Sequence, residues 1–162
     1  MQTAETFENY QTTMARMPKG VLLVTGKGNP MTIGWGQLGI MWGKPVFTVM
    51  VRPSRYSFEA ISRTGEFTVN VMPENAGKIL GICGAKSGRD TDKLALCGLT
   101  AGKSRTIQVP YLEQAEMVYE CRTIHRNLLA PETLPEDLLG KYYPQEDFHT
   151  YFFGEVLQTW KQ

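Results

Sequence analysis

The chain has 162 residues and a formal net charge of +1, with its 17 basic and 16 acidic side chains scattered along it. This length predicts a single domain over residues 1–162 that buries a sizeable core. The lack of a basic stripe argues against a nucleic-acid partner. No apolar run approaches the roughly 20 residues that a membrane span needs, so no membrane segment is expected.

The first ten residues contain no apolar core, so we expect no signal peptide. Three cysteines are widely spaced and form no C-x-x-C pair: Cys83, Cys97 and Cys121. This pattern suits reduced thiols and predicts a cytoplasmic protein. The two histidines, His125 and His149, are too few to anchor a metal site, and no metal is predicted.

The N-terminal part predicts one helix followed by strands. Residues 1–15 are polar and predict a helix, whereas residues 21–25, Val-Leu-Leu-Val-Thr, predict a strand. A glycine-rich connection then predicts a hairpin between that strand and residues 31–36. Residues 46–51, Val-Phe-Thr-Val-Met-Val, are apolar on both faces, which predicts an interior strand.

Three short helices are predicted in the middle of the chain. Ser54 or Ser57 is expected to cap the first of them, and Gly65 is expected to end it. The second helix is rich in isoleucine and leucine. Asp90 or Thr91 is expected to cap the third.

Strands are predicted at residues 67–71, 117–124 and 150–157. Between the last two, residues 126–147 are polar and rich in proline, with a helical turn expected at residues 136–142. No regular alternation of strand and helix appears, which argues against a doubly wound nucleotide fold. We therefore predict a mainly β protein, an antiparallel closed or split barrel with a few helices.

One stretch, Asn29 to Trp42, has too many glycines for an ordinary strand and too many apolar residues for an ordinary loop. Glycine inside a strand marks a bulge or the close approach of a backbone or ligand. Two interpretations are open: a bulged core strand, or a segment that holds the edge of a planar cofactor.

A second candidate is Arg52 to Ser57, where a strand ends and a helix begins. A helix start favours anions, and arginine offers a fork of donors that matches phosphate oxygens. The alternative is a capped helix with solvated arginines. The loop Ser87 to Lys93 has the same ambiguity, because Arg89 and Lys93 either face an anion or lie in solvent.

Two further residues have open roles. Cys83 is either a buried, inert thiol or a contact to a cofactor edge. His149 is either a structural hydrogen-bonding residue or a group on the open side of a cofactor. The sequence contains no nucleophile–base pair, no P-loop and no Gly-x-Gly-x-x-Gly after a strand.

Five motifs stand in order along the chain: Asn-Pro-Met-Thr-Ile-Gly-Trp-Gly, Val-Arg-Pro-Ser-Arg-Tyr-Ser, Gly-Glu-Phe-Thr-Val-Asn-Val, Ser-Gly-Arg-Asp-Thr-Asp-Lys and Phe-His-Thr-Tyr-Phe-Phe-Gly-Glu-Val. Together they resemble the flavin reductase-like, FMN-binding split-barrel proteins, in particular the flavoredoxin-type branch. The resemblance runs from about Pro18 to Val156. The long 126–147 segment matches the flavoredoxin-type branch better than the shorter flavin reductases.

The resemblance implies a homodimer of Greek-key barrels, with FMN bound near the dimer interface. By position, it implies that the flavin ring is lined by Met31, Thr32, Ile33, Gly34, Trp35 and Gly36. It implies that the phosphate is held by Arg52, Ser54, Arg55, Tyr56 and Ser57. Cys83, Gly84 and Lys93 are then expected to close the pocket, with His149 on the nicotinamide side.

The resemblance makes an NAD(P)H-dependent FMN reductase the expected function, with NADH or NADPH as electron donor and no catalytic side chain required. In such enzymes the cofactor carries out the chemistry, and the protein binds and orients it. An electron-transfer flavoprotein that receives electrons from a redox protein is the alternative. A β-barrel without a cofactor is a third possibility.

Overall fold

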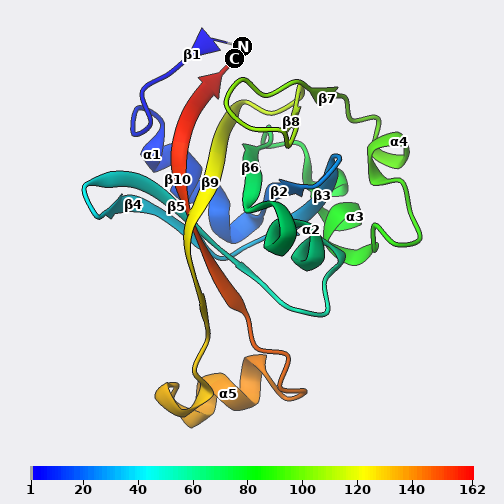
Figure 1. Cartoon of the computed structure of the whole chain (residues 1–162). Coiled ribbons are helices and arrows are strands. Elements are labelled where there is room, and N and C mark those ends of the chain that lie inside the picture. Colours follow the sequence, from blue (N-terminus) through cyan, green and yellow to red (C-terminus); the bar gives the residue numbers. More distant parts are fainter. Residues whose placement is uncertain (1) are drawn as a thin grey trace.

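The computed structural model describes residues 2–162, which form one large antiparallel sheet and a small two-stranded one (Figure 1). The large sheet has the order β3-β2-β6-β9-β10-β5-β4, and β1 pairs with β10. Its strands are β1 (Gln2–Thr3), β2 (Val21–Thr25), β3 (Asn29–Ile33), β4 (Gly36–Met41), β5 (Lys44–Val51), β6 (Glu66–Val71), β9 (Met117–Leu128) and β10 (Thr150–Lys161). The small sheet pairs β7 (Ala101–Gly102) with β8 (Tyr111–Leu112).

Most of the regular structure lies in these strands and the helices are short, which confirms the prediction of a mainly β protein. They are α1 (Tyr10–Arg16), α2 (Tyr56–Thr64), α3 (Gly77–Ala85), α4 (Lys93–Cys97) and α5 (Glu136–Tyr142), with 3-10 turns η1 (Met17–Lys19) and η2 (Pro131–Thr133). The helix predicted over residues 1–15 begins only at Tyr10; residue 1 lies outside the described part. Among residues 2–162, no helix is long and apolar enough to cross a membrane.

Strand β2 explains why the fold has two cores. All five of its residues are buried, because the strand is covered on both faces. Val21 and Leu23 pack inside the curled sheet with Phe47. Leu22 and Val24 point the other way, into a second core beneath α3 and α4. Alternation of side chains along the strand therefore ties the helices to the outside of the barrel.

The glycine-rich stretch is not one strand, so the predicted hairpin with residues 31–36 is wrong in its second half. β3 ends at Ile33, and the chain then crosses from one edge of the sheet to the other, where β4 pairs with β5. A Cβ atom at Gly36 would lie 2.9 Å from the carbonyl oxygen of Thr48. Gly36 thus allows β4 to approach β5, whereas residues 34–35 form the crossing.

Two of the predicted helix caps are wrong. The side chains of Ser54 and Ser57 do not cap α2: Ser54 Oγ donates to the carboxylate of Asp147 instead, and Ser57 Oγ accepts from Asn29 at 2.9 Å. Asp92, and not Asp90 or Thr91, caps α4 by accepting from the Ala95 amide at 3.1 Å. The prediction that Gly65 ends α2 is confirmed by its φ of +67°.

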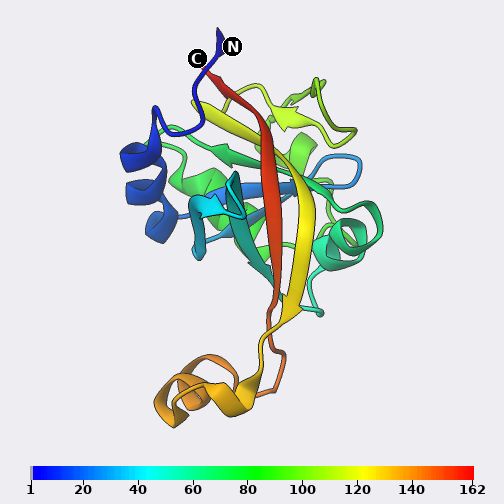
Figure 2. The same ribbon diagram turned by 60° about the vertical axis from the view of Figure 1, so that its left-hand side comes forward.

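Residues 129–149, which we call the arm, project from one end of the barrel. β9 runs beyond its predicted end at residue 124 as far as Leu128, and with the start of β10 at Thr150 it connects the barrel to the arm that carries α5 (Figure 2). At its other end, β10 runs beyond its predicted end at residue 157 as far as Lys161. The N- and C-terminal ends lie together at the opposite end of the molecule. The paired strands therefore place the arm beside the crossing between β3 and β4.

Candidate functional site

The crossing and the arm face each other across a cavity of about 600 Å³, which we call the aromatic cavity. It is lined by residues of the β3 end and crossing (Met31, Thr32, Ile33, Gly34, Trp35), of β5 and the following turn (Met50, Arg52, Ser54, Arg55) and of the arm (Lys141, Tyr142, Pro144, Gln145, His149). The Tyr142 ring meets the Trp35 indole edge-on, with the ring centroids 5.0 Å apart. Trp35 nevertheless remains 42% exposed.

A smaller cavity of about 130 Å³ adjoins the first, and we call it the basic cavity. Its charged lining residues are Arg55, Lys86, Arg89 and Lys93, and among residues 2–162 no acidic side chain lines it. Three serines, Ser54, Ser57 and Ser87, add hydroxyl groups. The two cavities share Met31, Ser54 and Arg55, so they form one continuous site.

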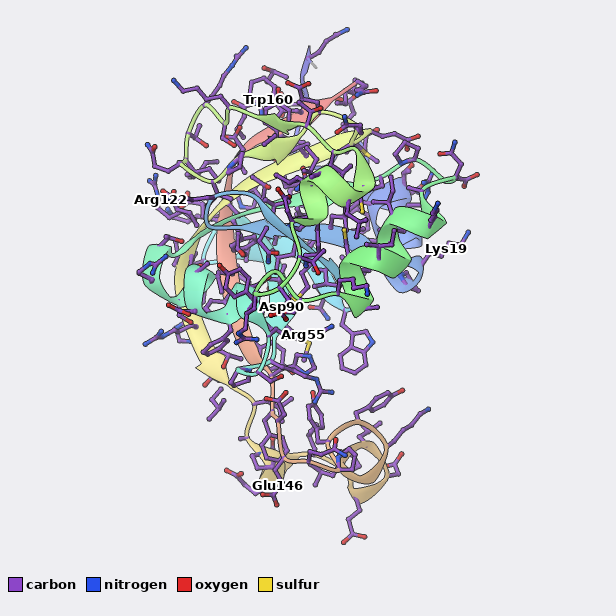
Figure 3. All side chains as sticks on the ribbon, turned by 90° about the vertical axis from the view of Figure 1, so that its right-hand side faces the viewer. Lys19, Arg55, Asp90, Arg122, Glu146 and Trp160 are labelled. Atoms are coloured by element: carbon purple, nitrogen blue, oxygen red, sulfur yellow. The ribbon has the colours of Figure 1, made fainter. Side chains whose placement is uncertain are left out.

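Local folding explains why these cations gather. β5 ends at Val51 and α2 begins at Tyr56 after a short turn, and the chain returns to the same place at the end of α3, where the Gly84 carbonyl lies within reach of Arg55. Figure 3 shows Arg55 and Asp90 close together below the helices, whereas Lys19 lies on the far side of α3. The Arg55 guanidinium donates to the Gly84 carbonyl at 3.0 Å, which fixes α3 to the start of α2.

Two more cations reach the basic cavity: Arg89 from the segment between α3 and α4, and Lys93 from the first position of α4. Arg89 donates to the Ser54 carbonyl at 3.1 Å, and its guanidinium lies 5.7 Å from the Tyr56 ring centroid. The Lys93 side chain is buried, with its Nζ 3.5 Å from the Cys83 carbonyl oxygen. Burial lowers the pKa of Lys93 below its usual value. Both cations therefore line the basic cavity, with Lys93 buried and Arg89 also exposed to solvent, and binding of an anion by this loop stays a prediction.

Cys83 lies behind this cavity, fully buried in the outer core. Burial, together with the neighbouring Cys97, raises the pKa of the Cys83 thiol to about 12, although Lys93 opposes the shift. The thiol is therefore protonated at neutral pH and packs as a small apolar group.

Arg52 has a structural role that the sequence did not indicate. Its guanidinium donates to the carbonyls of Asp147 at 2.9 Å and of Tyr142 at 2.7 Å. It also lies 4.9 Å from the centroid of the Tyr143 ring. Arg52 thus fixes the arm to the barrel and lines the aromatic cavity rather than the basic one.

His149 closes the far wall of the aromatic cavity. Its Nδ1 is 2.8 Å from the hydroxyl oxygen of Tyr143, and its ring centroid lies 5.3 Å from that of Trp35. Burial, assisted by the nearby charge of Arg52, lowers the pKa of His149 to about 4. The imidazole is therefore neutral at physiological pH.

Most of the residues that the sequence singled out line one of the two cavities. These are Met31, Thr32, Ile33, Gly34, Trp35, Arg52, Ser54, Arg55, Tyr56, Ser57, Lys93 and His149. Gly36, Cys83 and Gly84 line neither. Sequence reasoning missed Met50, Lys141 and Tyr142, because pairing with distant strands and the fold of the arm bring them there. The sequence analysis also missed Lys86, although this cation directly precedes the Ser87–Lys93 loop and could have been counted with Arg89 and Lys93.

Comparison with known proteins agrees with this architecture. The family described as the flavin reductase like domain matches residues 14–162. The chain belongs to this family. The predicted split-barrel fold is thereby confirmed, and solved structures of flavin reductase-like split barrels superpose on nearly the whole chain.

Three relatives illustrate the match of this flavin reductase-like chain. An uncharacterized protein of Archaeoglobus fulgidus is 27% identical over 140 residues, covering 85% of this chain and 69% of the relative. Flavoredoxin of Desulfovibrio vulgaris (Miyazaki F) superposes with a TM-score of 0.70 at 22% identity, covering 88% of this chain and 69% of the other. The FMN-binding domain of a flavin reductases-like enzyme from Shewanella baltica superposes with a TM-score of 0.70 at 20% identity, covering 99% of this chain and 76% of the other.

Proposed function

We propose that this flavin reductase-like protein binds FMN across the two adjoining cavities and reduces it with NADH or NADPH. The observation that carries the proposal is the basic cavity, which has four cationic side chains and, among the described residues, no acidic one. It opens into a larger cavity that contains Trp35, Met31 and Met50. A small cavity lined by cations, joined to a larger one that offers aromatic and methionine side chains among polar ones, fits a planar ring with a phosphate tail.

In this proposal Arg55, Arg89, Lys93 and the serine hydroxyls bind the phosphate. Hydrogen bonds to charged groups contribute on the order of 1.5–3 kcal/mol each, so the phosphate end accounts for much of the affinity. The α2 helix adds a positive dipole end at Tyr56. The exposed backbone of Gly34 borders the ring. Bound FMN supplies the capacity to accept a hydride, which no side chain of the chain has.

His149, Trp35 and the arm are proposed to form the substrate side. A neutral imidazole does not repel a cationic nicotinamide product, and it offers one N–H donor at the cavity wall. The Trp35 and Tyr142 rings provide flat surfaces for stacking. Lys141 lines the same wall and gives a positive charge for the phosphates of the donor.

A second candidate is electron transfer from a redox protein without oxidation of a nicotinamide. The arm favours it, because it covers one side of the aromatic cavity and leaves less room for a dinucleotide. The two candidates differ in the donor and not in the flavin site.

Anaerobic mixing of the flavin-loaded protein with NADH or NADPH tests the proposal. We expect the flavin absorption to bleach on mixing with at least one of them. A protein that stays yellow with both, yet bleaches with a reduced ferredoxin, is an electron carrier. A protein that binds no FMN contradicts both candidates.

We also propose a homodimer, as the resemblance implies. Trp42 and Ile40 at the end of β4 are 66% and 61% exposed, and the Trp42 ring packs beside His125 and Phe153. Exposed apolar patches of this kind mark interfaces on soluble proteins. A second copy of the chain is the proposed partner for this face.

A further inference from the structure

Ser54 belongs to both parts of the proposed flavin site, yet its hydroxyl is bound by the arm. The residue lines the aromatic cavity and the basic cavity. Its Oγ donates to one carboxylate oxygen of Asp147 at 2.5 Å, and its backbone amide lies 3.4 Å from the other. Asp147 itself lines neither cavity. The arm therefore holds, through one carboxylate, a residue that the flavin phosphate is expected to contact.

The Ser54 hydroxyl has a single proton, so it donates one hydrogen bond at a time. A carboxylate and a phosphate oxygen are both acceptors, and each of them needs that proton. In the flavin-free protein the proton goes to Asp147. Ser54 therefore donates either to the arm or to the phosphate, and never to both at once.

The charge of the Asp147 carboxylate opposes an anion as well. Among residues 2–162, this carboxylate forms no ion pair. The neighbouring Arg52 donates to the backbone carbonyl of Asp147 instead. Arg89, a cation of the basic cavity, donates to the Ser54 carbonyl at 3.1 Å, so Ser54 lies where an anion is expected. A phosphate there would lie beside a negative charge that has no cationic partner.

The contact between Ser54 and Asp147 also holds the part of the arm that covers the aromatic cavity. Pro144 and Gln145, shortly before Asp147 in the chain, line that cavity. The two bonds from Arg52 to arm carbonyls do not involve Ser54. When Ser54 turns away from Asp147, the arm therefore stays attached to the barrel but loses its side-chain contact to the start of α2.

We propose that Ser54 and Asp147 form a latch that couples the arm to the flavin phosphate: the phosphate takes the Ser54 hydroxyl from Asp147 and thereby loosens the arm over the aromatic cavity. The inference rests on the proposed flavin site and adds a conformational control to it. Because coupling is reciprocal, the latch weakens phosphate binding by the factor by which phosphate weakens the latch. Riboflavin, which has the same ring without the phosphate, leaves the latch closed.

Fluorescence titration of the flavin-free protein with FMN and with riboflavin tests the latch. The readout is the dissociation constant of riboflavin divided by that of FMN, because changes at the ring cancel in this ratio. Asp147→Asn removes the charge and weakens the competing acceptor. We expect it to raise the ratio by roughly threefold or more, within the range that one hydrogen bond contributes. Glu146→Gln is the matched control and should leave the ratio unchanged, because Glu146 is the adjacent carboxylate and is exposed on the arm, apart from Arg55 (Figure 3).

A Ser54→Ala background separates the shared proton from an effect of charge alone. The hydroxyl is absent there, so the further change Asp147→Asn should no longer raise the ratio. An increase of the same size in that background assigns the effect to charge and overturns the latch. A ratio that Asp147→Asn leaves unchanged in the native background also overturns the latch, and the proposed FMN site then stands without it.

Hydrogen exchange measures the other half of the coupling. The amides of Glu146 and Phe148 donate to carbonyls within the arm, so their exchange reports on its local opening. In the native protein, both amides should exchange faster with saturating FMN than with saturating riboflavin. In Asp147→Asn the two flavins should give equal rates. Exchange in the native protein that is no faster with FMN overturns the latch.

Failure of the flavin site itself has a different signature. If neither flavin binds, the proposed function is wrong, and inorganic phosphate then tests the latch alone. Phosphate should speed the exchange of the Glu146 and Phe148 amides in the native protein and not in Asp147→Asn. Exchange that phosphate leaves unchanged in the native protein overturns the latch.

Discussion

The hydroxyl of Tyr143 lies 2.8 Å from Nδ1 of His149, and both side chains are buried between the arm and the barrel. Among residues 2–162, Tyr143 Oη has no other hydrogen-bond partner. A buried O–H needs an acceptor, so the phenol donates to Nδ1 and the imidazole carries its proton on Nε2. Through this pair, the arm sets the tautomer of the histidine that faces the aromatic cavity.

We therefore expect His149 to be the Nε2–H tautomer at neutral pH. Long-range ¹H–¹⁵N NMR should show an unprotonated Nδ1 in the native protein and a mixture of tautomers in Tyr143→Phe. His125→Gln assigns the signals, because it removes the only other histidine. A protonated Nδ1 in the native protein would show that the hydrogen bond runs the other way.

The lowered pKa of His149 predicts a pH dependence of stability. Between pH 4 and its ordinary value of 6.5, the unfolded chain binds a proton that the folded protein does not. The free energy of unfolding should therefore rise as the pH increases through this window. Urea denaturation at several pH values should give a shallower rise in this window for His149→Gln. Parallel curves for the two proteins would refute the shift.

Arg55→Ala should weaken FMN binding by roughly tenfold or more, since loss of one charged donor costs at least about 1.4 kcal/mol. Arg55 is the one charged residue among residues 2–162 that lines both proposed flavin cavities. Arg126→Ala is the control, because Arg126 is exposed on β9 and lines neither cavity. Fluorescence quenching measures the dissociation constant, and equal values for both variants would exclude Arg55 from the site.

Arg52→Ala should weaken FMN binding for another reason. The variant loses the bonds to the Tyr142 and Asp147 carbonyls, so the arm should become looser and cleave faster in limited proteolysis. Arg55→Ala should leave the rate of cleavage in the arm unchanged. Weaker flavin binding without faster cleavage would instead assign Arg52 a direct contact.

Gly34→Val should fold normally and lose its flavin. A Cβ atom at Gly34 meets nothing of the protein closer than 3.7 Å, and Gly34 itself lines the wall of the aromatic cavity, so the larger side chain takes up room beside the proposed ring. Gly39→Val is the control, since nothing lies within 4 Å of a Cβ atom there and Gly39 lines neither flavin cavity. Absorption spectra after purification should show a yellow control and a colourless Gly34→Val. A fully loaded Gly34→Val contradicts the placement of the ring.

Ile40→Lys should convert the proposed dimer to a monomer. Light scattering coupled to size exclusion measures the mass directly. Leu96→Lys is a matched control, because Leu96 on α4 is also exposed, at 53%, but lies outside the Trp42 face. A native protein that is already monomeric would rule out the proposed interface.

Much of the fold followed from local pattern. Val21 to Thr25 and Val46 to Val51 are apolar on both faces, and such strands are stable only when they are covered on both sides. Gly65 ended its helix as expected, because glycine adopts a positive φ at low cost. The helix caps were less predictable. Ser54 is a good cap by type, but Asp147, distant in sequence, takes its hydroxyl.

The sequence by itself determined the apolar strands, the glycine-marked turns and the clusters of donors that resemble a flavin site. Only the tertiary structure decided which donors share a cavity. Arg52 and Arg55 are three residues apart and look equivalent in sequence, yet one binds the arm and the other faces the basic cavity. The reason is physical: a guanidinium bonds to whatever acceptors the fold places within reach, and the arm's carbonyls come from residues 90 positions or more along the chain.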